Sequence, residues 1–226
     1  MFEKIFKYKY PIVTVLLVLL IDQFIKIYIK THYVLGEEYR VAGNWFILHF
    51  TENPGMAFGM ELGGAWGKIL LSTFRIAAAG FGVYYIIKIV QKKEHKGYII
   101  CVSLILAGAV GNILDSMFYG LMFDQGTTLD TVTGEYIPYY GLAEYSSHGY
   151  AGFLHGCVVD MFYFPIIQGT FPEWFPIWGG EPFEFFRPVF NFADASISIG
   201  VVALLLFQKK FFKHKAEEVK VEPISN

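Results

Sequence analysis

The sequence predicts an all-α membrane protein, a bundle of four membrane-spanning helices with a small β-rich outer segment and long outer loops. Of its 226 residues, 54% are hydrophobic and only 17% are charged, whereas about 25% are charged in a soluble domain. Four apolar stretches each approach the roughly 20 helical residues that a hydrocarbon core requires. Lysines also flank one set of ends of these stretches. Together these observations predict a protein dissolved in lipid.

The predicted spans follow the apolar runs in chain order. They cover about residues 11–30, 66–90, 98–119 and 189–212. The first follows lysines, as a cleavable signal peptide would, but it leads into Asp22 and Lys26 with no small-residue cleavage site. We therefore expect it to remain as an anchor. A single membrane domain is expected over residues 1–215, followed by a polar tail at 216–226.

Positive charge is distributed unevenly along the chain. Eleven of the 18 Lys and Arg residues flank one set of span ends, and none lies between Gly97 and Phe186. The flanking residues are Lys4, Lys7, Lys9, Lys88, Lys92, Lys93, Lys96, Lys209, Lys210, Lys213 and Lys215. Because cytoplasmic loops carry the excess of positive charge, we expect both termini in the cytoplasm and residues 31–65 and 120–188 outside. The net charge of −2, with no dense basic stretch, gives no sign of nucleic-acid binding.

The two outer segments differ in pattern. From Tyr39 to Phe50, apolar and polar residues mix in a strand-like way, which predicts a small sheet. The longer segment is rich in aromatic rings, which favour the headgroup level of a membrane. These rings include Tyr136, Tyr139, Tyr140, Tyr145, Trp174, Phe175 and Trp178. The role of this segment stays open between a lid, a platform on the membrane surface and a contact for a partner.

Polar residues inside the spans form stripes on single helix faces. Ionisable groups there cost roughly 3 kcal/mol or more each near the bilayer centre, so each is a functional candidate. The stripes are Asp22 and Lys26; Lys68, Ser72 and Arg75; Gly108, Asn112 and Asp115; and Asn191, Asp194 and Ser198. All four lie in the outward half of their spans, which predicts a common polar pocket near the outer interface.

Each stripe also has a purely structural interpretation. Asp22 and Lys26 could form an ion pair that fixes helix packing, and Asn112 could hydrogen-bond between helices. Gly108 could permit close helix approach, and Arg75 could neutralise a buried carboxylate. These alternatives stay open from the spacing alone.

Five short motifs occur in order along the chain. They are Asp22-Gln-Phe-Ile-Lys26, Asn53-Pro-Gly-Met-Ala-Phe58, Gly108-Ala-Val-Gly-Asn-Ile-Leu-Asp115, Val158-Val-Asp160 and Phe190-Asn-Phe-Ala-Asp194. These motifs resemble the conserved boxes of lipoprotein signal peptidases (signal peptidase II), which are D-x-x-x-K, N-x-G-A-A-F, G-A-x-G-N-x-x-D, V-V-D-F and F-N-x-A-D. The order of the motifs and the predicted topology of four spans also resemble those of that family.

The resemblance implies an aspartyl endopeptidase that removes signal peptides from diacylglyceryl-modified prolipoproteins. Cleavage would occur before the lipidated cysteine, at the outer face of the bacterial cytoplasmic membrane. The family's catalytic pair matches Asp160 and Asp194. Positions that match its active site or the support of that site are Asp22, Lys26, Asn53, Gly55, Gly108, Asn112, Asp115, Asn191 and Ala193. Of these, Asp22 and Asp115 match positions whose role is structural. We expect a monomer among membrane lipids, with prolipoprotein substrates and neither cofactor nor metal.

The chain departs from the family pattern at several points. Ser116 stands where the family has an arginine, and we hypothesise that Arg75 of the second span restores the positive charge. Met56 replaces the usual alanine, a change that could reshape the loop beside the substrate. Two connections are longer than usual and look like insertions over the site, at residues 119–156 and 165–188.

Two carboxyls a few Å apart can hydrolyse a peptide without a metal, because like charges so close do not both ionise easily. One takes a proton from water and the other polarises the scissile carbonyl, and the two titrate as a pair. A Ser–Lys peptidase would need Ser72 beside Lys26, which no motif supports. A metalloprotease would need H-E-x-x-H, which the sequence lacks. A scaffold or proton-coupled carrier is the alternative from another class, and it should tolerate Asn at either aspartate.

Overall fold

The computed structural model describes residues 7–54, 64–130, 132–185 and 188–218. The chain forms two compact units. The helical unit comprises Met1–Gln23, Leu70–Leu114 and Phe192–Asn226. The sheet unit comprises Phe24–Ile69 and Asp115–Asn191.

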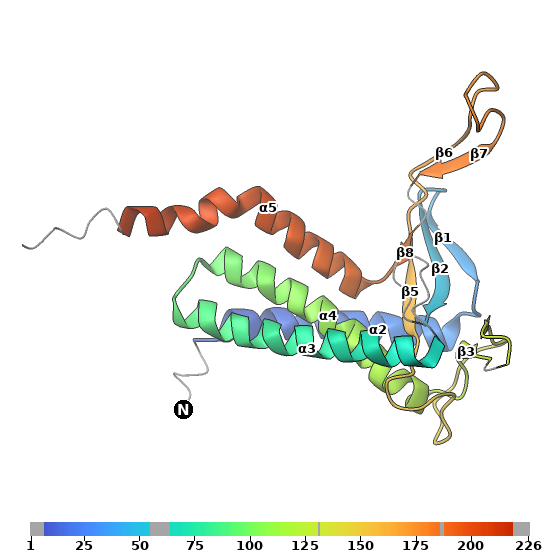
Figure 1. Ribbon diagram of the computed structural model, residues 1–226, viewed down its shortest axis with the longest axis horizontal. Helices are drawn as coiled ribbons and strands as arrows, with labels where there is room; N and C mark the ends of the chain where they lie inside the picture. Colours follow the sequence, from blue (N-terminus) through green and yellow to red (C-terminus); the bar gives the residue numbers. More distant parts are fainter. Residues whose placement is uncertain (1–6, 55–63, 131, 186–187, 219–226) are drawn as a thin grey trace, which may run out of the picture. The chain divides into compact units, whose positions relative to one another are not determined.

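Four long helices carry the apolar runs of the sequence. They are α2 (Lys9–His32), α3 (Gly64–Gln91), α4 (Lys96–Met122) and α5 (Phe192–Glu218) (Figure 1). Among the described residues, four helices are long and apolar enough to cross a membrane, and they are these four. The first three agree with the predicted spans to within about one helical turn.

The fourth helix begins later than predicted, which corrects the expected span from about residue 189. Val189–Phe190 form strand β8, and the helix begins at Phe192. Valine and phenylalanine fit a strand well, and here Phe190 is paired with Phe162 of a neighbouring strand. At its other end α5 reaches Glu218, three residues into the expected polar tail, and residues 219–226 lie outside the described residues.

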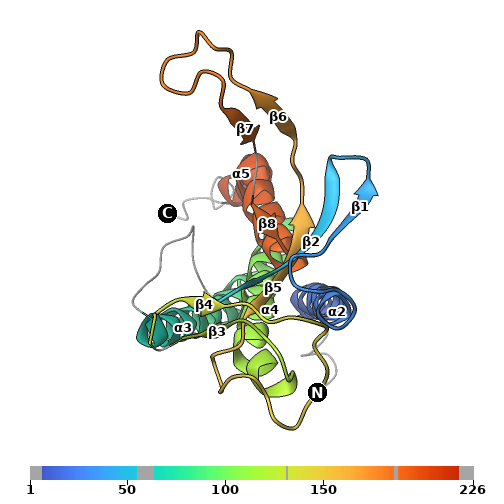
Figure 2. The same cartoon turned by 90° about the vertical axis from the view of Figure 1, so that its right-hand side faces the viewer.

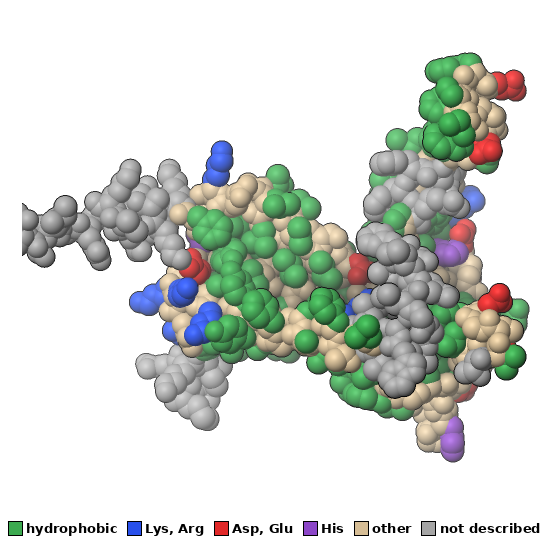
Figure 3. All heavy atoms as spheres, in the orientation of Figure 1, with side chains coloured by type: hydrophobic (Ala, Val, Ile, Leu, Met, Phe, Trp, Pro, Cys, Tyr) green, Lys and Arg blue, Asp and Glu red, His purple; other side chains and the backbone are tan. Residues whose placement is uncertain are grey.

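Much of the apolar surface of the helices is exposed. On α2, Leu20 is 67% exposed and Phe24 is 74% exposed, and on α5 Leu206 is 71% exposed. Figure 3 shows hydrophobic side chains spread over the helices, with Lys and Arg side chains gathered at the end where α3 and α4 join. Soluble proteins rarely expose contiguous apolar patches of this size. These faces suit contact with lipid.

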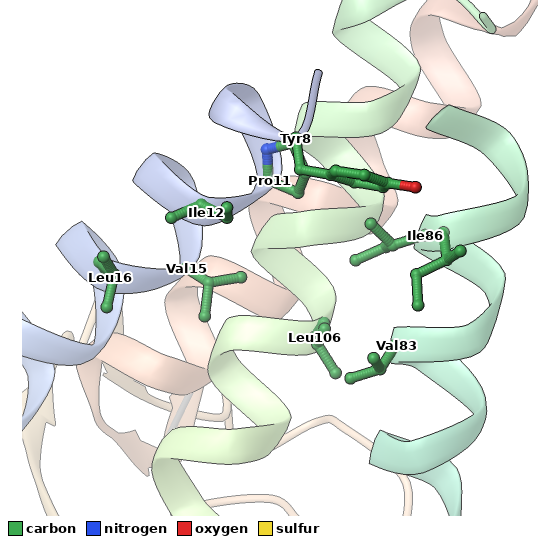
Figure 4. Close-up of a pocket in the computed structure, with 9 residues that line it drawn as sticks. Tyr8, Pro11, Ile12, Val15, Leu16, Val83, Ile86 and Leu106 are labelled. Atoms are coloured by element: carbon green, nitrogen blue, oxygen red, sulfur yellow. The ribbon is translucent and has the colours of Figure 1, made fainter. Parts of the chain in front are cut away.

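Within the helical unit, α3 and α4 pack through buried aliphatic side chains. These are Ile86, Ile89, Val90, Ile99 and Leu106. An open apolar groove of ≈ 650 Å³ lies between the two helices and α2 (Figure 4). It is lined by Tyr8, Pro11, Ile12, Val15, Leu16, Val83, Ile86, Ile87 and Leu106. Of the predicted site residues that the structure describes, none lines this groove.

The sheet unit is built on an antiparallel sheet of four strands. In spatial order these are β1 (Glu38–Ala42), β2 (Phe46–Asn53), β5 (Val158–Tyr163) and β8 (Val189–Phe190) (Figures 1 and 2). The small sheet expected in the first outer segment is therefore present as β1 and β2. It also recruits β5 and β8 from later in the chain. Ile29 of α2 packs against this sheet in a core that includes Phe50, Val159 and Met161.

Each of the two predicted insertions carries a short hairpin. In the first, β3 (Thr128–Leu129) pairs with β4 (Tyr136–Ile137). In the second, β6 (Ile167–Thr170) pairs with β7 (Pro182–Phe185). The β6–β7 hairpin leaves the sheet after β5 and returns to it at β8, so it extends the sheet unit beyond its four-stranded core (Figure 2).

Candidate active site

Asp160 lies in β5, inside the run Val158-Val-Asp-Met-Phe-Tyr163. The β-branched and aromatic residues of this run favour a strand. Asp160 is 5% exposed, and the Asn191 Nδ2 donates a hydrogen bond of 2.6 Å to its Oδ1. Asn191 is fully buried and directly follows β8, the strand that pairs with β5. The sheet therefore positions both the carboxylate and the amide that compensates its burial.

Asn53 is at the end of β2, next to β5. It is paired with Val158, and Thr51 is paired with Asp160. Asn53 is thus placed two residues from Asp160 along the neighbouring strand. Gly55, the next predicted site residue, and Met56 lie outside the described residues.

Lys26 and Asp115 form a buried ion pair in the sheet unit. The Lys26 Nζ lies 2.7 Å from the Asp115 Oδ2, and both side chains are 0% exposed. Charges at such depth are tolerated when they are paired. This contact joins α2 to α4. The structural role that the family match implies for Asp115 stays a prediction.

Asp194 lies in the first turn of α5, in the helical unit. The Asn112 Nδ2 of α4 donates a hydrogen bond of 2.8 Å to its Oδ1. The N-terminal end of a helix also favours a negative charge. Each of the two predicted catalytic carboxylates therefore accepts a hydrogen bond from an asparagine of a family motif, one in each unit.

Asp22 holds the start of α5 in place. Its Oδ1 accepts a hydrogen bond of 2.9 Å from the Ala193 backbone N–H. The first N–H groups of a helix lack partners within the helix, so a carboxylate from α2 serves as a cap for α5. Gly108 makes this approach possible, because a Cβ there would lie 2.2 Å from the Ala193 carbonyl oxygen. The Asp22 carboxylate is also close to Gly111 of α4, whose Cβ would lie 2.8 Å from its Oδ2.

Ser116 and Arg75 are the two residues of the hypothesised arginine replacement. Ser116 is buried in α4 at 4% exposure, and its carbonyl oxygen accepts a hydrogen bond of 2.9 Å from the Gly156 backbone N–H. Arg75 is half-buried on α3 in the helical unit. Its proposed role as a substitute charge stays a prediction.

A second buried ion pair was not predicted from the sequence. Lys30 of α2 contacts Glu52 of β2, and both side chains are 0% exposed. The Glu52 Oε2 also accepts a hydrogen bond of 2.6 Å from the Thr127 backbone N–H in the first insertion. The only sequence signal was the spacing of Lys30, one helical turn after Lys26 on the same face. This pair joins α2 to β2 and, through Thr127, to the first insertion. Glu52 is the residue immediately before Asn53.

Three aromatic rings surround the Lys30 ammonium. The ring centroids of Phe123, Tyr139 and Tyr150 lie 5.2, 5.0 and 5.2 Å from its Nζ. Such rings attract cations through their quadrupoles. Burial, followed by the nearby negative charges, raises the pKa of both tyrosines above the usual value. Both phenols therefore stay neutral over the working pH range.

No group of three or more His, Cys, Asp or Glu side chains that could hold a metal ion is found among the described residues. The predicted site residues in each unit include a carboxylate with an amide donor, and the sheet unit also holds a buried ammonium group. Such groups can accept and donate protons.

The chain resembles known proteins over most of its length. Residues 14–210 match the family model described as signal peptidase (SPase) II. A lipoprotein signal peptidase of Porphyromonas gingivalis is 51% identical over 85% of this chain and 79% of its own length. One from Amoebophilus asiaticus is 33% identical over 90% of this chain and 81% of its own length.

Solved structures show the same fold. Two solved structures of bacterial membrane enzymes superpose on this chain with a TM-score of 0.51 each. The first is 19% identical and the match covers 96% of this chain and 93% of the other. The second is 21% identical, with coverage of 87% and 90%.

Proposed function

Because the chain belongs to the signal peptidase II family, we propose that it is an aspartyl endopeptidase whose catalytic residues are Asp160 and Asp194. Membership of this family makes it a membrane protease that removes signal peptides from prolipoproteins. The catalytic type is the proposal. The observation that carries it is the matched environment of the two carboxylates, each of which accepts a hydrogen bond from an asparagine side chain.

Chain connectivity supports the pairing. Asn191 is hydrogen-bonded to Asp160 across 2.6 Å, and Asp194 follows Asn191 by three residues. Three residues span at most about 11 Å. The backbone of Asp194 is therefore tethered within about 11 Å of the residue that contacts Asp160.

The proposed reaction uses one ionised and one protonated carboxyl. The ionised carboxyl takes a proton from a water molecule while the water oxygen attacks the scissile carbonyl carbon. The protonated carboxyl donates a hydrogen bond to the carbonyl oxygen and stabilises the negative charge that develops there. The carbon–nitrogen bond then breaks, and the carboxyl that took the proton from water passes it to the leaving amine. The proposal assigns neither role to one particular aspartate.

We propose that the substrate is a prolipoprotein with a diacylglyceryl-modified cysteine, cleaved just before that cysteine. A transmembrane signal helix and a lipid would hold this bond at the membrane surface, beside the start of α5. The lysine-flanked helix ends would lie in the cytoplasm and both aspartates at the outer side of the bacterial cytoplasmic membrane. We expect a monomer that works without a cofactor.

In the proposal, the remaining site residues hold Asp160 and Asp194 in position. Asp22 caps α5 and so fixes Asp194, while the Lys26–Asp115 pair links α2 to α4. Asn53 follows Glu52, which the Lys30 pair anchors, so the β2 end is held beside β5. Gly55 is included as a site residue because of the family match. Arg75 is included because its positive charge could replace the arginine that the family has at Ser116.

The test is cleavage of a diacylglyceryl-modified prolipoprotein by purified protein in detergent, with a chelator present. We expect wild type to cleave and Asp160→Asn and Asp194→Asn each to be inactive while still folded. Asp124→Asn is the matched control, because Asp124 is exposed and lies in the first insertion. Full cleavage by either mutant would remove that aspartate from the mechanism. Loss of wild-type cleavage on chelation would instead indicate a metal enzyme.

A further inference from the structure

The loop that joins β6 and β7 is a compact aromatic structure, which we call the aromatic tip (Phe171–Glu181). Its ends are closed by two backbone hydrogen bonds, from Phe171 N–H to the Glu181 carbonyl and from Gly180 N–H to the Phe171 carbonyl, of 2.9 and 3.0 Å. A third bond of 2.9 Å, from Phe175 N–H to the Pro172 carbonyl, turns the chain within the loop. The tip therefore has its own defined conformation.

Ring packing organises the inner side of the tip. The Phe171 ring lies 4.9 Å from that of Phe175 and 4.7 Å from that of Phe183, measured between centroids. Trp178 packs against both Phe171 and Phe175 at 6.1 and 6.2 Å. Aromatic pairs at these separations stabilise one another beyond the area they bury.

The outer side of the tip exposes large apolar side chains. Trp174 is 79% exposed, Ile177 is 88% exposed and Trp178 is 51% exposed. Ile177 also has a positive φ of 77°. For a β-branched residue this backbone conformation is a genuine outlier, and strain of this kind persists where the surroundings impose it, often at functional sites. The loop thus holds an isoleucine outward in a conformation that glycine or asparagine would adopt more easily.

Charge in the tip is low and of one sign. Glu173 and Glu181 are its only charged residues, and no Lys or Arg occurs between Gly97 and Phe186. An anionic surface would therefore repel the tip rather than attract it. Exposed tryptophans with little charge are typical of side chains that sit at the headgroup level of a membrane.

The position of the hairpin within the sheet unit agrees with this composition. The outer turns of α2, from Phe24 to His32, belong to the same unit and pack on the sheet through Ile29. Figures 1 and 2 show that the sheet and the β6–β7 hairpin run across the direction of these outer turns of α2 rather than continuing along it. Where these turns leave a membrane, a hairpin in this direction stays near the level of the headgroups.

We propose that the aromatic tip inserts into the headgroup region of the bilayer and anchors the sheet unit to the membrane surface. Trp174 and Ile177 enter the interface, and the inner ring stack keeps the loop rigid as they do so. The ligand is a zwitterionic lipid surface, since the tip carries no cation to bind an anionic headgroup. This anchor does not depend on the aspartyl mechanism, so its test is separate from that of the proposed function.

The test measures lipid contact of the tip in the full-length protein. Trp45→Phe and Trp66→Phe leave Trp174 and Trp178 as the only tryptophans. This protein is placed in phosphatidylcholine nanodiscs whose acyl chains are either plain or brominated near the glycerol. We expect brominated lipid to quench the tip emission to an extent comparable with a reference protein in which all four tryptophans are replaced by phenylalanine and Phe24→Trp is the one indole, at an exposed position toward the outer end of α2.

Two results would overturn the proposal. The first is emission that brominated lipid leaves unchanged and that aqueous acrylamide quenches strongly, as expected for a tip that faces water or binds a protein partner. The second comes from Ile177→Asn, which relieves the positive φ and removes the apolar side chain. We expect this variant to unfold at the same temperature as its parent or higher and to lose quenching by brominated lipid. Undiminished quenching would contradict insertion of Ile177.

Discussion

Asn191 donates a hydrogen bond of 2.6 Å to Asp160 and stands only three residues ahead of Asp194. It is the last residue of the sheet unit, and the next residue, Phe192, begins α5. One buried amide therefore contacts the first carboxylate and is covalently tied to the helix turn that carries the second. This relationship makes Asn191 the most informative position for separating chemistry from structure.

Asn191→Ala should reduce cleavage strongly while leaving the helices intact. A hydrogen bond to a charged group contributes about 1.5–3 kcal/mol, so we expect kcat/KM to fall by roughly one to two orders of magnitude. Removing the donor at Asp160 removes a group that favours the ionised form of the aspartate pair, so the acidic limb of the pH–rate profile, which reports that ionisation, should move to higher pH. The measurement is kcat/KM against pH with a lipid-modified prolipoprotein.

The control for this change is Asn44→Ala, which removes an exposed asparagine in the turn between β1 and β2. It should leave both the rate and the pH profile unchanged. If the rate falls for Asn191→Ala while the acidic limb of the pH–rate profile stays unshifted, Asn191 has a packing role and does not stabilise the ionised carboxylate.

Gly108→Ala should disrupt the contact between α4 and α5. The added Cβ would lie 2.2 Å from the Ala193 carbonyl oxygen, so the first turn of α5 must move. Overpacking costs about 1–3 kcal/mol, and here it displaces the turn that carries Asp194. Gly80→Ala is the matched control, since nothing lies within 4 Å of its Cβ on α3. We expect thermal unfolding in detergent to be lowered by the first change and unchanged or raised by the second. Equal effects would contradict the close packing at Gly108.

The Lys26–Asp115 pair should behave as a buried charge pair in stability measurements. Lys26→Met leaves the Asp115 carboxylate buried at 0% exposure without this partner. Breaking such a pair costs about 3–5 kcal/mol. Because an apolar pair of similar volume is often neutral, the double variant Lys26→Met with Asp115→Leu should recover most of the lost stability. Thermal unfolding of the two variants tests this.

Activity of the same double variant separates the two roles of the pair. A stable but inactive protein would place Lys26 in the catalytic environment, as the family match implies. A stable and active protein would show that the pair only holds α2 and α4 together.

The helices were accessible to sequence reasoning because apolar runs of this length have few other interpretations. The start of α5 was not, since Val189–Phe190 is as apolar as a span, and only its pairing with β5 makes it a strand. That pairing links positions far apart in sequence, which periodicity cannot reveal. The motifs singled out Asp160 and Asp194 as catalytic candidates, which stays a prediction, but no pattern could show that asparagines are their hydrogen-bond donors.

The Lys30–Glu52 pair was missed for a related reason. At the end of a span, a lysine is ordinarily interpreted as a residue that reaches for the interface. Glu52 lies in an outer strand, where an acidic residue is ordinarily exposed. Their burial depends on the first insertion, whose Thr127 N–H and aromatic rings cover both side chains. Chain-specific insertions create environments that a family motif does not encode.

The aromatic surroundings of Lys30 lead to a prediction for alkaline pH. Burial is the main cause that raises the pKa of Tyr139 above its ordinary value of 10.0, and the Glu52 charge adds to it. Above about pH 10 the unfolded chain releases this proton and the folded chain keeps it. The unfolded state then binds fewer protons, so the free energy of unfolding falls as pH rises.

Tyr139→Phe should therefore reduce this loss of stability at alkaline pH. Its hydroxyl is buried with no hydrogen-bond partner among the described residues, so its removal should be neutral or stabilising at pH 7. Tyr150→Phe is the contrasting variant, because the Tyr150 hydroxyl accepts a hydrogen bond of 2.8 Å from the Cys157 backbone N–H. We expect it to lower stability at pH 7 by about 1 kcal/mol. Unfolding temperatures between pH 7 and about pH 11 measure both effects, and an alkaline loss that persists undiminished in Tyr139→Phe would show that other groups carry it.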